Sequence, residues 1–231
     1  MKSLLFCFLL LTPVFCHDFS SSSESCEDDG GHHHGGGRPR PPGRPPGGNG
    51  GGGANGGCGN GWRRFNRPSG PWCIRVFRGQ HLQANAESEC VRIGGALTGL
   101  QDPQEINYIT NSFFQLNPTL NSGSIWIGAK RTNGCLNRAP TGNCAGANGF
   151  FWTDGSASGT GGFQFNQGQP DNAHGATQNC MVLLASKSPT VFDGRYTWQA
   201  SKLDDVGCGW RTPGNIPRKI MAFACGKKPN N

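Results

Sequence analysis

Apolar residues recur every three or four positions in two early segments of the chain, which is the spacing of an amphipathic helix. The first segment runs from His81 to Ile93 and is ended by Gly94-Gly95. The second opens at Asp102-Pro103, with the acid at the cap and the proline in the first turn, which is typical of a helix start. The residues on its predicted inner face are Ile106, Ile109 and Phe113. Beyond Asn117-Pro118 no further helix is predicted.

Short apolar runs elsewhere predict strands, some of them separated by long glycine-rich loops. These runs are Trp62 to Phe65, Trp72 to Phe77, Ala96 to Leu100, Ser124 to Ala129, Phe150 to Thr153, Cys180 to Leu184, Tyr196 to Gln199 and Lys219 to Cys225. Two helices followed by short strands predict an α+β domain. Loops of this length are unusual in a compact domain unless they are functional or cross-linked.

The N-terminal segment predicts export. Residues 1–16 combine a positive start, an apolar run from Leu4 to Leu11 and a plausible cleavage pattern, which is typical of a secretory signal peptide. The run is far shorter than the roughly 20 residues that span a membrane, and no later segment is apolar enough, so no membrane span is predicted. We therefore expect a secreted, extracellular protein.

Residues 17–57 are rich in glycine, proline, serine and histidine, and predict a disordered tether because they cannot bury enough apolar surface to offset chain entropy. The domain is expected over residues 58–226, followed by a tail over 227–231. Nine cysteines remain after the signal peptide, which indicates disulfide bonds and leaves one cysteine over. Cys26 in the tether is our candidate, and it offers a route to a covalent dimer.

The net charge of the chain is +7, and the charge is concentrated from Cys58 onward, where there are 17 basic and 9 acidic residues. A basic extracellular domain favours anionic partners such as acidic glycans, although ordinary solubility charge explains it equally well. No nucleic-acid-binding motif and no basic stripe interleaved with aromatic residues occurs, so no nucleic-acid partner is predicted.

Several motifs, in their order and spacing, together resemble the long form of the C-type lectin domain of secreted invertebrate proteins. They are the opening hairpin CGNGWRRFNRPSGPWC, Cys90, Trp126-Ile127-Gly128, Phe151 to Gly155, Gln169-Pro170-Asp171, Cys180, Asp204-Asp205 before Cys208, and Cys225. The resemblance covers Cys58 to Cys225. It implies a C-type lectin-like fold with two helices, small antiparallel sheets and a long loop region stapled by disulfides.

The resemblance also implies how the cysteines pair. The family ties its first helix to its last strand and staples the base of its long loop, which corresponds to Cys90–Cys225 and Cys180–Cys208. The opening hairpin suggests Cys58–Cys73, and the remaining two cysteines give Cys135–Cys144. The Cys90–Cys225 bridge closes the longest loop, so we expect it to stabilise the fold most, by about 4–5 kcal/mol on chain-entropy grounds.

By the same resemblance, one calcium ion is expected in the long loop, since calcium takes six to eight oxygen ligands. The positions that match the family's ligands are Gln169, Asp171, Gln178, Asp204 and Asp205. The family usually has glutamate at position 178 and asparagine at 204, so one carboxylate is lost and one gained. The family's proline bond here is cis. An auxiliary calcium site is not expected, because Lys130-Arg131 would repel the ion.

The Gln-Pro-Asp motif implies galactose-type sugars, including GalNAc, held by Gln169, Asp171, Asp204 and Asp205. Galactose binders usually add an aromatic ring after the motif, and His174 is the only flat ring in the loop. Trp126 and Trp152 are expected in the core, whereas Trp198 and Trp210 flank the loop and either role is open to them. A solvent-exposed turn that has lost its ligand is the structural alternative for the motif.

We therefore expect a calcium-dependent, carbohydrate-binding lectin with a role in innate defence. The alternative is a calcium-independent module that binds protein or anionic polymers through its basic surface. An enzyme is not predicted, because neither His81 nor His174 stands at a recognisable spacing from a nucleophile and an orienting acid.

Overall fold

The computed structural model describes residues 56–211, 214 and 216–230. The expected signal peptide, nearly all of the expected tether and Cys26 lie outside these residues. Among the described residues, no helix is both long and apolar enough to cross a membrane.

The helices are α1 (Gln83–Arg92), α2 (Pro103–Leu116) and the short α3 (Ala173–Ala176), with 3-10 turns at Asn133–Cys135, Gly142–Cys144 and Gly146–Gly149. The strands are β1 (Arg63–Arg67), β2 (Gly70–Arg78), β3 (Ala96–Leu97), β4 (Ser122–Arg131), β5 (Phe150–Trp152), β6 (Cys180–Ser186), β7 (Thr190–Asp193), β8 (Tyr196–Gln199), β9 (Leu203–Val206) and β10 (Ile220–Lys227). The Asp102 side chain caps α2 by accepting from the backbone N–H groups of Gln104 and Glu105, as the sequence predicts.

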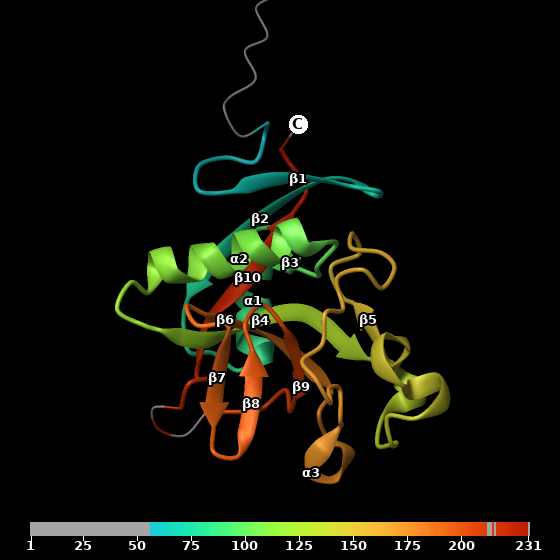
Figure 1. Ribbon diagram of the computed structural model, residues 1–231. Coiled ribbons are helices and arrows are strands. Elements are labelled where there is room, and N and C mark those ends of the chain that lie inside the picture. The colour runs from blue at the N-terminus through green and yellow to red at the C-terminus, as the bar shows by residue number, and fades with distance from the viewer. Residues whose placement is uncertain (1–55, 212–213, 215, 231) are drawn as a thin grey trace, which may run out of the picture. The chain divides into compact units, whose positions relative to one another are not determined.

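One sheet connects most of the strands in the order β1-β2-β10-β4-β6-β9, with β3 paired to β10 and β5 to β4. Strands β7 and β8 form a separate hairpin. The pair β10–β4 is parallel, whereas the resemblance led us to expect antiparallel sheets. Strand β9 and α3 lie toward one end of the domain, and β1 and the C-terminus lie toward the other (Figure 1).

Alternating side chains of β4 enter two different cores, because successive residues of a strand point to opposite faces. Ile125 and Ile127 pack in one core with Phe113 of α2. Trp126 packs in the other core with Ala86 of α1. The two predicted helices therefore cover opposite faces of the central sheet, and the remaining edge, β6 to β9, is left to carry the long loop (Figure 1).

The described residues contain four disulfide bonds, at Cys58–Cys73, Cys90–Cys225, Cys135–Cys144 and Cys180–Cys208. They match the four pairs that the family resemblance implies. Cys90–Cys225 joins α1 to β10, and Cys180–Cys208 joins the start of β6 to the segment after β9. The second of these bridges ties the end of the long loop, at the start of β6, to the segment after β9.

Three elements differ from the sequence-based prediction. Strands β7 and β9 were not predicted, and α3 forms in a region where no helix was expected. Strand β9 is only four residues long and contains two aspartates, so its sequence lacks the apolar alternation that identifies a strand. It is nevertheless wholly buried, and this fact decides the chemistry of the site.

Candidate functional site

The Gln-Pro-Asp turn of the long loop, which runs between β5 and β6, is held to β9 by one carboxylate. The backbone N–H of Asp171 donates to Oδ1 of Asp205, and that of Asn172 donates to Oδ2, each at 3.0 Å. The bond between Gln169 and Pro170 is cis, as in the family. The Oε1 atom of Gln169 accepts from the same Asp171 N–H at 3.0 Å. The carboxylate of Asp205 therefore holds the Gln-Pro-Asp turn in place by accepting hydrogen bonds from its backbone.

Two further polar side chains are used to hold the loop's own backbone. Asn172, which has a left-handed backbone (φ 46°), accepts from the N–H of Gln178 at 3.0 Å and donates to the carbonyl of Arg138 at 2.8 Å. The Oε1 atom of Gln178 accepts from the N–H of Ala173 at 2.5 Å. Both side chains are buried, so the amide oxygen of Gln178 is turned toward the chain.

Arg131, the last residue of β4, supplies a positive charge under the loop. Its guanidinium is fully buried and donates to Oδ2 of Asp205 at 2.5 Å. It also donates twice to the carbonyl of Gln178, at 3.1 and 3.0 Å. The ring of Phe150 lies 4.4 Å away on one side. Burial raises the pKa of Asp205 to about 6 even though Arg131 acts to lower it.

A second arginine pairs with the neighbouring aspartate. Arg218, just before β10, donates to Oδ2 of Asp204 and, at 3.4 Å, to Asp193. Its guanidinium lies 3.6 Å from the ring centre of Trp198 and 5.2 Å from that of Trp210. Burial raises the pKa of Asp204 to about 7, against the lowering effect of Arg218. The two aspartates of β9 thus each have their own arginine.

These contacts test whether the five expected ligands fit calcium. Asp205 already accepts three N–H groups, Asp204 is bonded to Arg218, and the oxygens of Gln169 and Gln178 accept backbone N–H groups. A dication beside Asp205 would also face the buried guanidinium of Arg131, and like charges repel strongly where water is excluded. Over the described ranges, no group of three or more His, Cys, Asp or Glu residues is placed to hold a metal. As they lie, these residues do not fit a calcium ion.

The structure brings together the residues that the sequence predicts for the site, and it adds two arginines, Arg131 and Arg218, that the prediction does not include among the site residues. Lys130-Arg131 was interpreted as a reason for the absence of an auxiliary ion only, whereas Arg131 lies at the main position itself. Asp171, by contrast, keeps an exposed carboxylate with one backbone partner, Ala173. The carboxylate of Asp204, where the family usually has asparagine, is a sequence feature that points to such an arginine, because a buried charge needs a counter-charge.

A cavity of about 380 Å³ opens beside the loop. Its walls come from the second half of the loop and from the segment after β9, and they are formed by His174, Thr177, Gln178, Gly207, Cys208, Gly209 and Trp210. Trp210 therefore supplies the large aromatic surface that the loop itself lacks. Trp126 is buried, and Trp152 is stacked on Phe163 with ring centres 3.7 Å apart, so both belong to the core as predicted.

Comparisons with known proteins agree with the family resemblance of the sequence. The family model for C-type lectin domain-containing protein 141/158 matches residues 63–228. The galactose-specific lectin nattectin of Thalassophryne nattereri is 31% identical over 128 residues, which cover 55% of this chain and 67% of that lectin. Among solved structures, the C-type lectin CEL-I of Cucumaria echinata is 18% identical with a TM-score of 0.49, covering 75% of this chain and 99% of CEL-I. A calcium-independent type II antifreeze protein is 21% identical with a TM-score of 0.45, covering 74% of this chain and 93% of that protein. The chain belongs to the family of C-type lectin domain proteins.

Proposed function

We propose that this domain is a carbohydrate-binding lectin that seats a sugar residue between its long loop and Trp210, without chemical turnover and without calcium at the Gln169-Pro170-Asp171 turn. The observation that carries the proposal is the pair of ion pairs Arg131–Asp205 and Arg218–Asp204. Two guanidinium groups supply the two positive charges that a calcium ion would otherwise bring. The loop is therefore held in shape by the chain's own cations.

The cavity beside the loop has the chemistry that a sugar requires. The ring of Trp210 offers an apolar face for the C–H side of a pyranose, and the amide of Gln178 keeps its N–H donors free of any partner in the described part of the chain. The hydroxyl of Thr177, which donates to the carbonyl of His174 at 3.0 Å, still accepts. These groups bind hydroxyls directly, with no metal between them.

The test is binding to galactose, GalNAc and a panel of neutral glycans, measured by calorimetry with calcium and again with EDTA. We expect the same affinity in both conditions. Trp210→Ala should weaken binding about tenfold or more, which corresponds to roughly 1.4 kcal/mol. The matched control is Phe192→Ala, because Phe192 is an exposed aromatic residue on the separate β7–β8 hairpin. Retained affinity in Trp210→Ala would contradict the proposed position of the sugar.

A second candidate is calcium-dependent binding of galactose-type sugars through Gln169, Asp171, Gln178, Asp204 and Asp205. The exposed carboxylate of Asp171 and the likeness to a galactose-specific lectin favour it. It requires Arg131 to leave Asp205 when the ion binds. Loss of binding in EDTA, together with a similar loss in Asp171→Ala, would establish this candidate in place of the first.

Export from the cell is part of the proposal, since four disulfide bonds in one domain suit an oxidising compartment. A role in innate defence and a covalent dimer through Cys26 remain proposals as well. Electrophoresis of the secreted protein with and without reductant tests the dimer, which should migrate at twice the monomer mass only without reductant.

A further inference from the structure

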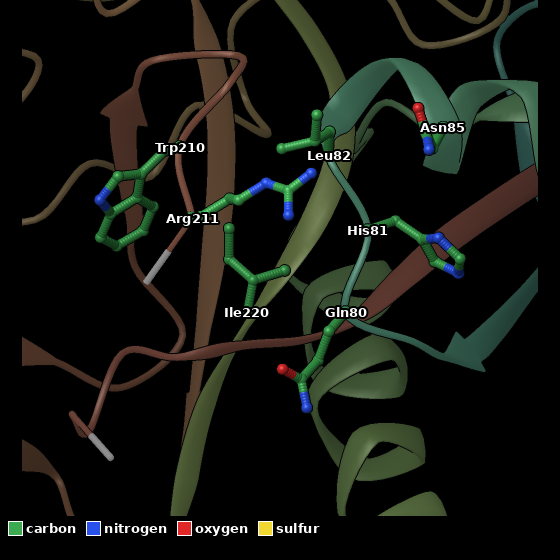
Figure 2. A pocket seen from close by; sticks show the side chains of 7 residues that line it. All are labelled: Gln80, His81, Leu82, Asn85, Trp210, Arg211 and Ile220. Carbon is green, nitrogen blue, oxygen red and sulfur yellow. The ribbon is translucent and has the colours of Figure 1, made fainter. Parts of the chain in front are cut away.

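Trp210 also lines a second cavity, of about 270 Å³, which none of the five predicted ligands enters. This cavity lies between the start of α1, the segment after Cys208 and the first residue of β10. Figure 2 shows Trp210 at one side of it and the side chain of Arg211 extending over Ile220 toward Leu82. One indole ring thus borders two adjacent cavities, one beside the long loop and one beside α1.

The charge of the second cavity comes from one unpaired cation. Arg211 is exposed and has no hydrogen bond, ion pair or ring contact among the described residues, whereas Arg131 and Arg218 each have a carboxylate. Among the described residues, none that lines the cavity is acidic. His81 contributes little, because its ring packs edge-on against Phe223 with centres 5.2 Å apart and points away from Arg211 in Figure 2.

Neutral donors stand around this cation. The side-chain amides of Gln80 and Asn85 line the cavity, and neither has a partner in the described part of the chain. Asn85 lies in the first turn of α1, a ten-residue helix whose start has no side-chain cap. The partial positive charge of that helix end adds to the charge of Arg211. The cavity therefore combines a free guanidinium, two amides and an aromatic face.

We propose that this second cavity binds the acidic residue of an oligosaccharide, with its carboxylate or sulfate on Arg211, its hydroxyls on Gln80 and Asn85, and its apolar face toward Trp210. A guanidinium binds either anion with two parallel N–H donors. Because Trp210 borders both cavities, one glycan spans them, with a neutral residue beside the long loop and an acidic residue beside α1. This inference rests on the proposed function and narrows its ligand class to acidic glycans.

The experiment compares a neutral galactose-containing oligosaccharide with the same oligosaccharide carrying a terminal sialic acid or a 6-sulfate, all in EDTA and at 150 mM salt. We expect the acidic ligands to bind about tenfold more tightly. Arg211→Gln should remove this advantage and leave the neutral affinity unchanged. Arg195→Gln is the control, because Arg195 is exposed on the hairpin between β7 and β8 and its loss changes net charge equally.

A protein-observed readout locates the ligand independently of affinity. In 15N-resolved NMR spectra, free galacturonate should shift the side-chain amide signals of Gln80 and Asn85, and free galactose should not. Equal losses in Arg211→Gln and Arg195→Gln would show a diffuse basic surface and overturn the site. Equal binding of acidic and neutral glycans would overturn it too, while the proposed function would stand. If acidic glycans bound and neutral glycans did not, the proposed sugar site beside the long loop would be wrong, and the acidic site beside α1 would stand.

Discussion

Two buried arginines in this domain do different work, and the difference lies in how completely they are satisfied. Arg67 of β1 donates to both oxygens of Glu105 at 2.7 and 2.8 Å, to Asp154 at 2.8 Å and to the carbonyl of Gly99 at 2.9 Å. Each of its guanidinium nitrogens has a partner. This cluster joins β1, the first turn of α2 and the turn after β5, where the long loop begins.

Arg131 has one carboxylate, one carbonyl and one buried nitrogen, Nη1, that has no partner in the described part of the chain. In β9, the Oδ1 atom of Asp204, which pairs with Arg218 through its other oxygen, is also buried and has no partner among the described residues. Buried polar atoms without partners are rare and costly, and where they persist they often mark a functional region. The Arg67 cluster is therefore fully satisfied and structural, whereas the Arg131 cluster leaves a buried guanidinium nitrogen without a partner among the described residues, at the position where the resemblance implies calcium.

The largest expected effect is at Arg67. Arg67→Met leaves Glu105 and Asp154 buried without a counter-charge, and breaking such a buried ion pair costs about 3–5 kcal/mol. Urea unfolding should show this loss. The control is Arg92→Met, whose arginine forms an exposed pair with Glu89 and should change stability by no more than about 1 kcal/mol. If Arg67→Met lowered the free energy of unfolding no more than Arg92→Met, the Arg67 cluster would not be a main source of stability.

The next effect is at Arg131. Arg131→Met should destabilise the domain by about 3 kcal/mol, less than at Arg67 because only one carboxylate, Asp205, loses its partner. In this variant alone, added calcium should raise the unfolding temperature, since Asp205 and Asp171 are then free to bind a cation. Calcium should stabilise neither the natural chain nor Arg67→Met.

The result that would break the comparison is stabilisation of the natural chain by millimolar calcium. Calcium would then displace Arg131 from Asp205, and Arg131 would not replace the ion permanently. Differential scanning fluorimetry of the three proteins, each with calcium, with magnesium and with EDTA, separates these outcomes. The magnesium arm identifies any general effect of divalent ions.

The sequence could predict the frame of the site more fully than its chemistry. The periodicity of α1 and α2 depends on neighbouring residues, so it is readable along the chain. The ends of the long loop and its disulfides follow from motifs that resemble one family. What holds the loop depends instead on a contact between Arg131 and Asp205, 74 positions apart. No local pattern encodes such a contact.

Strand β9 shows why the sequence alone does not predict the charge balance of the site. Leu203 to Val206 reads as a polar turn, because two of its four residues are aspartates. In the fold it is a buried edge of the main sheet, and burial is possible because Arg131 and Arg218 neutralise it. The number of carboxylates in the sequence equals that of a usual calcium site. That number does not include the two cations that the fold adds, Arg131 from β4 and Arg218 from the segment before β10.

The smallest expected effect concerns pH and the Arg218 side of the cluster. Burial raises the pKa of Asp204 to about 7 from its usual 3.8, so between these values the folded chain holds a proton that the unfolded chain has released. Stability should therefore fall as pH rises from about 4 to 7 and change no further with Asp204 above that range. Asp205, with a pKa of about 6, contributes in the lower part of the same window.

Asp204→Asn should flatten the slope of stability against pH between pH 6 and 7, measured by urea unfolding at several pH values. Asp193→Asn, which removes the other acidic partner of Arg218, is the control and should leave that slope unchanged. An unchanged slope in Asp204→Asn would mean that the ion pair with Arg218 lowers the pKa of Asp204 by more than burial raises it. Asp204 would then stay ionised in the folded chain, and Arg218 would compensate its carboxylate as fully as Arg67 compensates Glu105.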